Sequence, residues 1–403
     1  MVNLQLDTCV IKNARIVLPE SVISNGFLEI VKGRIVKVAE GNFTSGSMER
    51  IFDIQQATLT PGFIDLHVHG GNGGAFTSID PAEHILAREF HLKNGTTSML
   101  ASTHTTEFSS LLAILNSLAE SSRSNKSGSK VLGIHTEGPF ISEHKPGAHV
   151  VAQLKTGDLS AIQAVISAAD NFVSMVTIAP EIPGGLDAIK YLLDKNIVSS
   201  IGHTNATYAQ AVEGIKAGAR STTHLFNAMS PLAHRDPGAV GAVLDNDNIF
   251  AELILDGIHI HEAIFRIALK SKGVDRINLI TDATSLAGLP DGEYGALPDR
   301  AVTKIGGKIV LAGTDTLAGS ALSMNMVYQN AAKFAPLTLS ELSKLSSLNA
   351  AKILGKEADI GSLEVGKLAD LVLLDSESKV CATMIEGEWK YVHDDWKEAL
   401  SSQ

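Results

Sequence analysis

The sequence predicts an α/β protein in which a (β/α)₈ TIM-type barrel is joined to a small β-sandwich domain built from both chain ends. Two observations support this fold class. Apolar, β-branched runs alternate with amphipathic patterns through the middle of the chain, and both ends are rich in short β runs. A chain of 403 residues exceeds the usual size of one core, unless most of it forms a large α/β barrel.

The N-terminal part, residues 1–58, is expected to form a small antiparallel sheet. Its β-rich runs are interrupted by Asn13, Gly33 and Gly41, which favour turns. The expected strands are 9–11, 15–17, 26–32, 34–39 and 50–53.

From Thr60 onward, strand patterns alternate with helix patterns. The eight expected strands are 62–67, 97–102, 131–136, 173–179, 197–202, 220–224, 249–256 and 277–281. Amphipathic helices are expected at 83–93, 107–120, 159–169, 184–194, 207–217 and 262–271. Eight βα steps in succession fit a barrel. A doubly wound open sheet is the alternative, but GGNGG at 70–74 lacks the GxGxxG spacing, so we expect a flexible loop there.

The C-terminal part returns to β-like patterns after about residue 300. Short runs occur at 301–302, 308–312 and 370–374, and 384–392 could be one more strand. We expect this end to complete the N-terminal sheet. The predicted domains are a small β domain, residues 1–58 with 355–403, and a barrel domain, residues 59–354.

The composition excludes several classes of function. A formal net charge of −11 argues against a surface for nucleic acid or anionic membrane. Cys9 and Cys381 are the two cysteines, so no disulfide framework is expected and a reducing cytosol fits. The first residues lack the basic-then-apolar form of a signal peptide, and no apolar run approaches the roughly 20 residues that span a bilayer. We expect a cytoplasmic protein.

Polar side chains gather at the ends of the predicted strands, where barrels collect their functional groups. His67 and His69 are two residues apart on a strand, so their side chains face the same side. A single histidine at a strand end is more often a packing residue, but here six strand ends carry such groups. They are His67 and His69, His135 to Glu137, His203, His224, Asp256 to His259, and Asp282. Imidazole and carboxylate groups together predict a divalent metal, with Zn²⁺ first and Fe²⁺, Mn²⁺ or Co²⁺ as alternatives.

Ordered motifs in the chain resemble the amidohydrolase superfamily. PGFIDLHVH (61–69) is followed much later by GSLEVGKLADLVLLD (361–375). Other stretches resemble the N-acetylglucosamine-6-phosphate deacetylases of that superfamily, from about residue 10 to 390. They are HTEGPF (135–140), GAH (147–149), IGHTNAT (201–207), THLFNAM (223–229), RDPG (235–238), DGIH (256–259), TDAT (281–284) and LAGS (317–320). The resemblance implies hydrolysis of the substrate's acetamide to glucosamine 6-phosphate and acetate, in amino-sugar catabolism or recycling.

The resemblance also implies roles for the metal ligands. Many superfamily members carry a carboxylated Lys after the fourth strand, but VTIAPE (176–181) offers none. The residues implied for the main metal are therefore Glu137, His203 and His224. His67 and His69, with Asp282, would hold a second metal. Asp282 would also accept a proton from the attacking water and pass it to the departing amine; the alternative for Asp282 is simple ligation.

The resemblance further implies a binding site for the sugar phosphate. Its residues would be Ala148, His149, Asn227, Ala228, Arg235, Asp256, His259, Leu317, Ala318 and Gly319. His149 would contact the sugar or the acetyl oxygen, and the backbone N–H groups of Asn227 and Ala228 would bind phosphate. Arg235 would reach the neighbouring subunit's site, which implies a homodimer; the alternative is an interface salt bridge.

Other readings stay open. Seven other histidines are expected on the solvated surface (His84, His91, His144, His234, His393) or as supports of the ligands (His104, His135). An N-acetylgalactosamine-6-phosphate deacetylase differs in substrate by the orientation of one hydroxyl, which sequence alone does not distinguish. A cyclic-amide amidohydrolase is disfavoured because the strand-4 Lys is missing. A non-catalytic scaffold should have lost ligands, yet the whole set is present.

Overall fold

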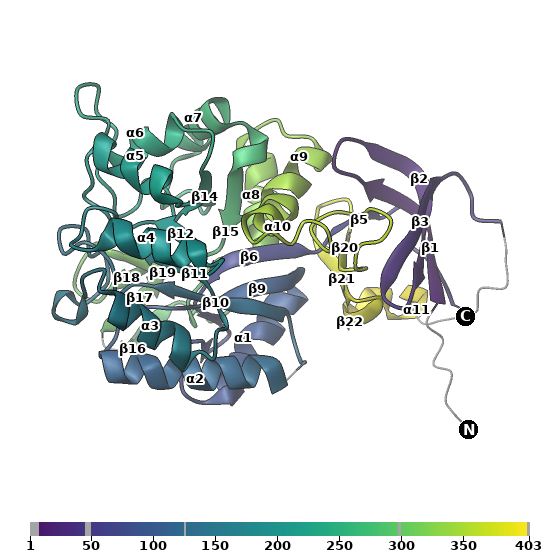
Figure 1. Ribbon diagram of the computed structural model, residues 1–403. Coiled ribbons are helices and arrows are strands. Elements are labelled where there is room, and N and C mark those ends of the chain that lie inside the picture. Colours follow the sequence, from purple (N-terminus) through teal and green to yellow (C-terminus); the bar gives the residue numbers. More distant parts are fainter. Residues whose placement is uncertain (1–7, 45–49, 125, 297–299, 401–403) are drawn as a thin grey trace.

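Eight parallel strands form the barrel at the centre of the molecule. In the computed structural model, which describes residues 8–44, 50–124, 126–296 and 300–400, their order is β15-β14-β13-β12-β11-β10-β9-β6. All eight expected strands are confirmed. They are β6 (Phe63–Val68), β9 (Thr96–Thr103), β10 (Lys130–Glu137), β11 (Val173–Ile178), β12 (Val198–Ile201), β13 (Ser221–Thr222), β14 (Phe250–Ile254) and β15 (Ile277–Ile280). Figure 1 shows helices wrapped around them.

The first and last strands of the barrel are joined by side chains as well as by backbone. The Asp282 N–H donates to the His67 carbonyl at 2.8 Å, and Val68 and Ala283 form an isolated bridge. The fully buried Asp65 carboxylate accepts from the Thr281 hydroxyl and from the His67 backbone N–H. This seam holds the ends of β6 and β15 together, and both ends carry predicted metal ligands.

The six expected helices are present, with ends that the sequence explains. Thr207 caps its helix through a capping box with Gln210, and Asp80 accepts from the Ala82 N–H ahead of Pro81. These helices are α1 (Pro81–Lys93), α2 (Phe108–Ser124), α3 (Leu159–Ala168), α4 (Gly185–Asp194), α5 (Tyr208–Ala217) and α7 (Glu262–Lys272). Further helical segments were not expected: η1 (Val151–Gln153), α6 (Gly238–Leu244), η2 (Val274–Arg276), α8 (Met324–Phe334), α9 (Leu339–Ser343), η3 (Lys344–Leu348), α10 (Asn349–Ile353), η4 (Asp394–Trp396) and α11 (Lys397–Leu400). Among the described residues, no helix combines the length and the apolar character that a membrane crossing requires.

Both chain ends build one sheet beside the barrel, as predicted. Its order is β22-β21-β20-β5-β1-β2-β3, and β4 pairs with β1. In Figure 1 the purple N-terminal and yellow C-terminal strands lie together at one end of the molecule. The strands are β1 (Thr8–Val17), β2 (Val22–Val31), β3 (Arg34–Glu40), β4 (Ile51–Asp53), β5 (Thr58–Pro61), β20 (Leu371–Leu374), β21 (Val380–Ile385) and β22 (Glu388–Val392). The domain boundaries at 58 and 355 stay a prediction.

The expectation of a purely antiparallel sheet at this end was wrong. β1 pairs in parallel with both β4 and β5. Neither partner is reached by a tight hairpin, because β2 and β3 lie between them and β1 in the chain. Parallel pairing needs a crossover connection of this kind.

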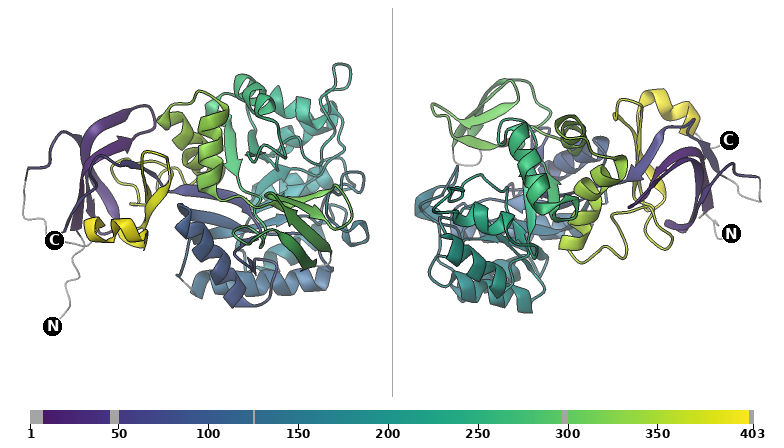
Figure 2. Two further views of the ribbon diagram at one scale, coloured as in Figure 1. Left: turned by 180° about the vertical axis from the view of Figure 1, so that it is seen from behind. Right: turned by 90° about the horizontal axis from the view of Figure 1, so that it is seen from above.

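Residues 301–312 do not complete that sheet, contrary to the prediction. β16 (Gly292–Ala296), β17 (Ala301–Ile305), β18 (Lys308–Leu311) and β19 (Leu317–Ser320) form a separate antiparallel sheet. In Figure 2 this green sheet lies against the barrel, away from the purple and yellow strands. Its core of Val302 and Ile309 packs on Leu286, and Lys304 donates to the Leu286 carbonyl at 3.1 Å. A short β run shows that a strand exists, but not which strand it pairs with.

The glycine-rich stretch after β6 is ordered and helps to bury two histidines. β7 (Gly70–Gly71) and β8 (Gly74–Ala75) pair as a small hairpin where a flexible loop was expected, and α1 packs against it. His84 lies 2.7 Å from the Ser121 hydroxyl, and His91 lies 2.9 Å from the Gly70 carbonyl. Both histidines are buried rather than solvated, because α1 is covered by the hairpin on one side and by α2 on another.

Candidate active site

Three side chains from different strand ends form a compact group of ligand atoms. Glu137 ends β10, and His203 and His224 follow β12 and β13. Glu137 Oε1 lies 2.8 Å from His224 Nε2 and 3.2 Å from His203 Nε2, and the two imidazole nitrogens are 3.2 Å apart. All three residues are buried, and their ligand atoms converge on one point. The barrel therefore brings together the three residues predicted for the main metal.

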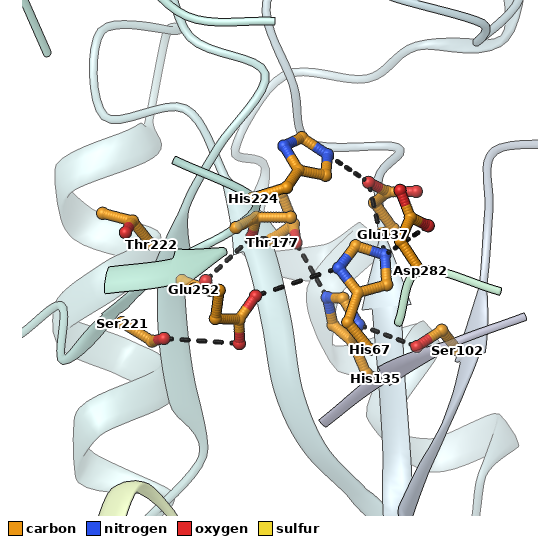
Figure 3. A network of polar contacts seen from close by, with 12 residues as sticks. His67, Ser102, His135, Glu137, Thr177, Ser221, Thr222, His224, Glu252 and Asp282 are labelled. Carbon is orange, nitrogen blue, oxygen red and sulfur yellow. Dashed lines mark hydrogen bonds and ion pairs between the residues drawn. The ribbon is translucent and has the colours of Figure 1, made fainter. Parts of the chain in front are cut away.

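A second group of ligand atoms lies beside the first. His67 Nε2 is 3.0 Å from His69 Nε2, and Asp282 Oδ1 lies 3.5 Å from His67 Nε2 and 3.3 Å from His69 Nε2. Glu137 is shared, since its carboxylate oxygens lie 3.5 Å from His67 Nε2 and 3.3 Å from His69 Nε2. The two groups are thus halves of one centre, linked by a single carboxylate. Figure 3 shows Glu137 between His224 of the first group and His67 of the second.

The backbone at three of these ligands is left-handed. The φ angles are +46° at His203, +35° at His224 and +51° at Asp282. Non-glycine residues rarely adopt such angles, and strained backbone of this kind concentrates at functional sites. Each residue lies two positions after the end of a barrel strand, where the left-handed turn directs the side chain into the barrel mouth.

Outer contacts fix how two of the rings present their nitrogens. His203 Nδ1 donates to the Lys145 carbonyl at 2.9 Å, which leaves the Nε2 lone pair directed at the ligand group. His149 Nδ1 accepts from the Thr105 backbone N–H at 3.3 Å, so its Nε2 carries the proton. That Nε2 lies 3.5 Å from Glu137 Oε2. His149 is therefore a hydrogen-bond donor at the edge of the centre.

The electrostatic field keeps both central carboxyl groups ionised. Burial raises the pKa of Asp282, but the adjacent His67 and His69 outweigh it and hold that pKa at about 2. Burial also raises the pKa of Glu137, but the surrounding imidazoles outweigh it and hold that pKa well below its usual value. His67 makes the largest contribution among them. Burial lowers the pKa of His104 to about 3, with a further contribution from His69, so this ring is neutral.

These residues fit a bound divalent metal. Each half of the centre offers two imidazole nitrogens and one carboxylate oxygen, the donor set of Zn²⁺ and related ions. Neutral imidazole has one N–H, and in His203 the Lys145 carbonyl already uses it. Lone pairs of several Nε2 atoms that point at one place repel one another, and a cation bound between them removes this repulsion.

A cavity of about 530 Å³ opens above the ligand centre. Its size lies within the roughly 300–1,000 Å³ of small-molecule sites. Predicted ligands at its floor are His69, Glu137, His203, His224 and Asp282, and predicted substrate residues on its walls are Ala148, His149, Asn227, Ala228, His259, Leu317, Ala318 and Gly319. His67 is fully buried beneath the floor. The structure thus gathers most of the predicted site around one cavity.

Two predicted roles differ from the structure, those of Asp256 and of the Asn227 backbone N–H, and the role of Arg235 at a neighbouring subunit stays a prediction. Arg235 is exposed and lies outside the lining of this cavity in its own chain. Asp256 also lies outside the lining, and its carboxylate accepts from His259 Nδ1 at 2.6 Å, so it orients the ring that reaches the cavity. The Asn227 backbone N–H donates to the His224 carbonyl at 3.0 Å and is already used. The Asn227 side chain and Ala228 remain on the cavity wall.

Several lining residues were missed by sequence reasoning. His104 follows β9 and lines the cavity, and its place at a strand end was the available signal. His144 and Lys145 come from the loop after β10; His144 is exposed, as expected, and it also lines the cavity. Asp315 and Thr316 lie between β18 and β19, where no sequence pattern pointed to a site.

Comparison with known proteins supports this picture. The model of the amidohydrolase family matches residues 58–392. An N-acetylglucosamine-6-phosphate deacetylase of Bacillus subtilis is 36% identical over 394 residues, 96% of this chain and 98% of the relative. An N-acetylgalactosamine-6-phosphate deacetylase of Escherichia coli is 34% identical over 332 residues, 82% of this chain and 87% of the relative.

A solved structure is similar over almost the whole length. It is a mutant N-acetyl-D-glucosamine-6-phosphate deacetylase from Mycobacterium smegmatis in complex with N-acetyl-D-glucosamine 6-phosphate. The TM-score is 0.90 at 36% identity, with 96% of this chain and 100% of that chain covered. With its barrel, its shared carboxylate and the match over residues 58–392, this chain belongs to the amidohydrolase family.

Proposed function

We propose that this chain is a metal-dependent deacetylase that hydrolyses the acetamide of N-acetylglucosamine 6-phosphate to glucosamine 6-phosphate and acetate. The observation that carries the proposal is the two-part ligand centre, shared through Glu137, at the floor of a cavity lined by the predicted substrate residues. The N-acetylglucosamine-6-phosphate deacetylases among its relatives support the choice of substrate.

The residues that would hold the metal follow from the two groups. Glu137, His203 and His224 would hold the main ion, and the second group, with Asp282, would hold another. Zn²⁺ suits these donors best, with Fe²⁺, Mn²⁺ or Co²⁺ as alternatives. When bound, such a cation supplies Lewis acidity, which acidifies water and polarises a carbonyl.

Asp282 is the residue proposed to move the proton. Its carboxylate is ionised, because the neighbouring imidazoles hold its pKa at about 2, and it lines the cavity beside the ligand nitrogens. It would accept a proton from the attacking water and return it to the amine nitrogen as the C–N bond breaks. Amide hydrolysis needs this second transfer, since an unprotonated amide nitrogen is a very poor leaving group.

Cavity residues would orient the substrate. The Nε2–H of His149, fixed by the bond from the Thr105 N–H to Nδ1, suits a contact with the acetyl oxygen. His259, held by Asp256, would contact the sugar phosphate from the other wall. Ala228 lines the cavity and would contact the phosphate through its backbone N–H. Asn227 lines the cavity beside it, but its side-chain amide donates to the His224 and Leu225 carbonyls at 3.3 and 3.5 Å.

The proposal includes a homodimer in which Arg235 completes the neighbouring site. Arg235 is exposed and does not line the cavity of its own chain, so a role in substrate binding requires another copy. The test mixes Arg235→Ala chains with Asp282→Asn chains. A mixed dimer has one site with both native residues, so activity should reappear on mixing. Two inactive parents whose mixture stays inactive would rule out the shared site.

The decisive assay is acetate release by the metal-loaded chain. N-acetylglucosamine 6-phosphate, N-acetylgalactosamine 6-phosphate and their unphosphorylated forms are compared side by side. The expected result is fastest release from N-acetylglucosamine 6-phosphate, loss of activity with a chelator, and recovery when metal is added back. Acetate release from none of the four at any metal loading would refute the deacetylase.

A second candidate is deacetylation of N-acetylgalactosamine 6-phosphate. It is supported by the Escherichia coli relative, which is 34% identical. The same assay distinguishes the two substrates. Faster acetate release from N-acetylgalactosamine 6-phosphate would make it the preferred substrate in place of N-acetylglucosamine 6-phosphate. A cyclic-amide hydrolase has less support, since β11 and the turn after it offer no Lys and Glu181 there accepts from the Thr204 hydroxyl.

A further inference from the structure

One fully buried carboxyl group inside the barrel has no role in the mechanism above. Glu252 lies on β14, two residues before Ile254, which lines the cavity. Alternate residues of a strand face the same side, so Glu252 points into the barrel one layer below the cavity. Its side chain is completely shielded from solvent.

Glu252 faces His67 and little else. Glu252 Oε2 lies 3.8 Å from His67 Nδ1, and Figure 3 shows the two side chains directed at one another. Among the described residues, neither atom has a hydrogen-bond partner. The other oxygen, Oε1, is 3.4 Å from the Ser221 hydroxyl. No Lys or Arg of the described chain forms an ion pair with Glu252.

The opposite nitrogen of the same ring belongs to the ligand centre. His67 Nε2 lies 3.0 Å from His69 Nε2 and 3.5 Å from Asp282 Oδ1. The ring is also held sideways by His135, whose centroid is 4.6 Å away at an interplanar angle of 86°. His135 is fixed in turn by the Ser102 and Thr177 hydroxyls. The His67 ring therefore has one nitrogen for the ligand centre and one for Glu252.

We propose that Glu252 is a positioning residue for the second metal, holding the Nδ1–H of His67 so that Nε2 is offered to the ion. The distance of 3.8 Å is longer than a hydrogen bond, and a side-chain movement of about 1 Å closes it. A carboxylate behind a metal-bound imidazole fixes the ring's tautomer and makes it a stronger ligand. It also places a compensating negative charge next to a cation site, which explains why an unpaired carboxyl group is kept in the barrel interior.

This inference deepens the proposed function and rests on it for the presence of a metal. It adds that the group of His67, His69 and Asp282 binds a second metal ion. The competing explanation is that Glu252 only fills space in the barrel core, in which case an isosteric neutral side chain would serve equally well.

The experiment measures metal binding. Wild type, Glu252→Gln and Glu252→Ala are stripped with a chelator, and Co²⁺ binding is followed by its absorption spectrum and by metal analysis. We expect two ions per wild-type chain and, in Glu252→Ala, a loss of about 10- to 100-fold in affinity for one of them. Glu252→Gln should show a smaller loss, because its amide oxygen still accepts from Nδ1–H.

Two controls make the result specific. In a His67→Ala background, Glu252→Ala should cause no further loss, since the ring on which it acts is gone. Asp370→Asn changes another buried carboxyl group, which lies outside the ligand centre and accepts from Lys130 Nζ at 2.7 Å. This variant should bind both ions as wild type does. Unfolding temperatures of all variants are measured in the metal-free state. If Glu252→Ala does not fold, Glu252→Gln still tests the inference, because its side chain fills nearly the same volume.

The inference is overturned if Glu252→Gln and every folded Glu252 variant bind both ions as tightly as wild type. It is also overturned if wild type takes up one ion only, or if the loss persists in the His67→Ala background. Acetate release is measured on the same samples. A wild type that binds two ions but releases no acetate would refute the proposed deacetylase and leave the metal comparison standing.

Discussion

Gly147 is a sensitive point of the site, because a methyl group added there would push directly on a ligand. A Cβ at this position would lie 2.9 Å from His203 Cε1, whereas ordinary contacts begin at 3.4 Å. The imidazole must then withdraw by about 0.5 Å, the tolerance within which functional groups need to be held. Because His203 Nε2 is 3.2 Å from both Glu137 Oε1 and His224 Nε2, the displacement opens the ligand group.

We expect Gly147→Ala to weaken metal binding and to slow acetate release by about tenfold, since a displacement of 1 Å can cost about 10²-fold. The backbone adds a cost of its own: φ at Gly147 is +57°, and a left-handed alanine loses about 1 kcal/mol of stability. Gly355→Ala is the matched control, with φ of +65° and no atom within 4 Å of the added Cβ.

The assay compares both variants with wild type by metal titration, acetate release and thermal unfolding. Both variants should lose similar stability, whereas Gly147→Ala alone should lose metal affinity and rate. If Gly147→Ala matched Gly355→Ala in metal affinity and in rate, the steric reasoning would be wrong and His203 would not be held as tightly as the geometry indicates.

Other predictions use the same preparations. Asp282→Asn should lower acetate release by about 10²- to 10⁴-fold, the usual contribution of a general acid–base group, while the main metal stays bound; wild-type turnover would remove Asp282 from the proton path. His203→Ala should lower metal occupancy by metal analysis, and unchanged occupancy would exclude it as a ligand. Chelation should lower the unfolding temperature, since an ion that binds only the folded chain stabilises it, and Zn²⁺ should restore it. Asp256→Asn should raise the KM for the phosphorylated sugar more than it lowers kcat, because it loosens His259.

The barrel could be predicted because its signal is local. In β9, Thr96–Thr103, every residue is buried, and the run combines three β-branched threonines with a central Met-Leu-Ala and carries no charge. α6 was missed for the opposite reason. Its sequence, GAVGAVL, has two glycines and two valines that disfavour a helix, yet all seven residues are buried. Tertiary packing outweighs the weak intrinsic propensity there.

The meeting of the ligand residues could be predicted because side chains alternate regularly between the two faces of a β-strand. His67 and His69 must share a face, and strand ends must meet at one mouth of a barrel. The substrate side of the site depends on loops, whose positions no period fixes. Asp315 and Thr316 reach the cavity only because β16–β19 packs on Leu286, and this pairing is not encoded in any single run.

Sequence patterns do not reveal that the backbone is left-handed at three of the ligands. His203, His224 and Asp282 all adopt positive φ without being glycine, at a cost of roughly 1–2 kcal/mol each. Strand-end positions indicate that the three side chains meet, but local backbone preference disfavours the conformation that each of them adopts. Surrounding contacts overcome the preference: the Asp282 N–H donates to the His67 carbonyl, and the His203 ring donates to the Lys145 carbonyl. The ligand geometry is thus imposed by the closed barrel, and the strain falls on the residues that a metal ion would then stabilise.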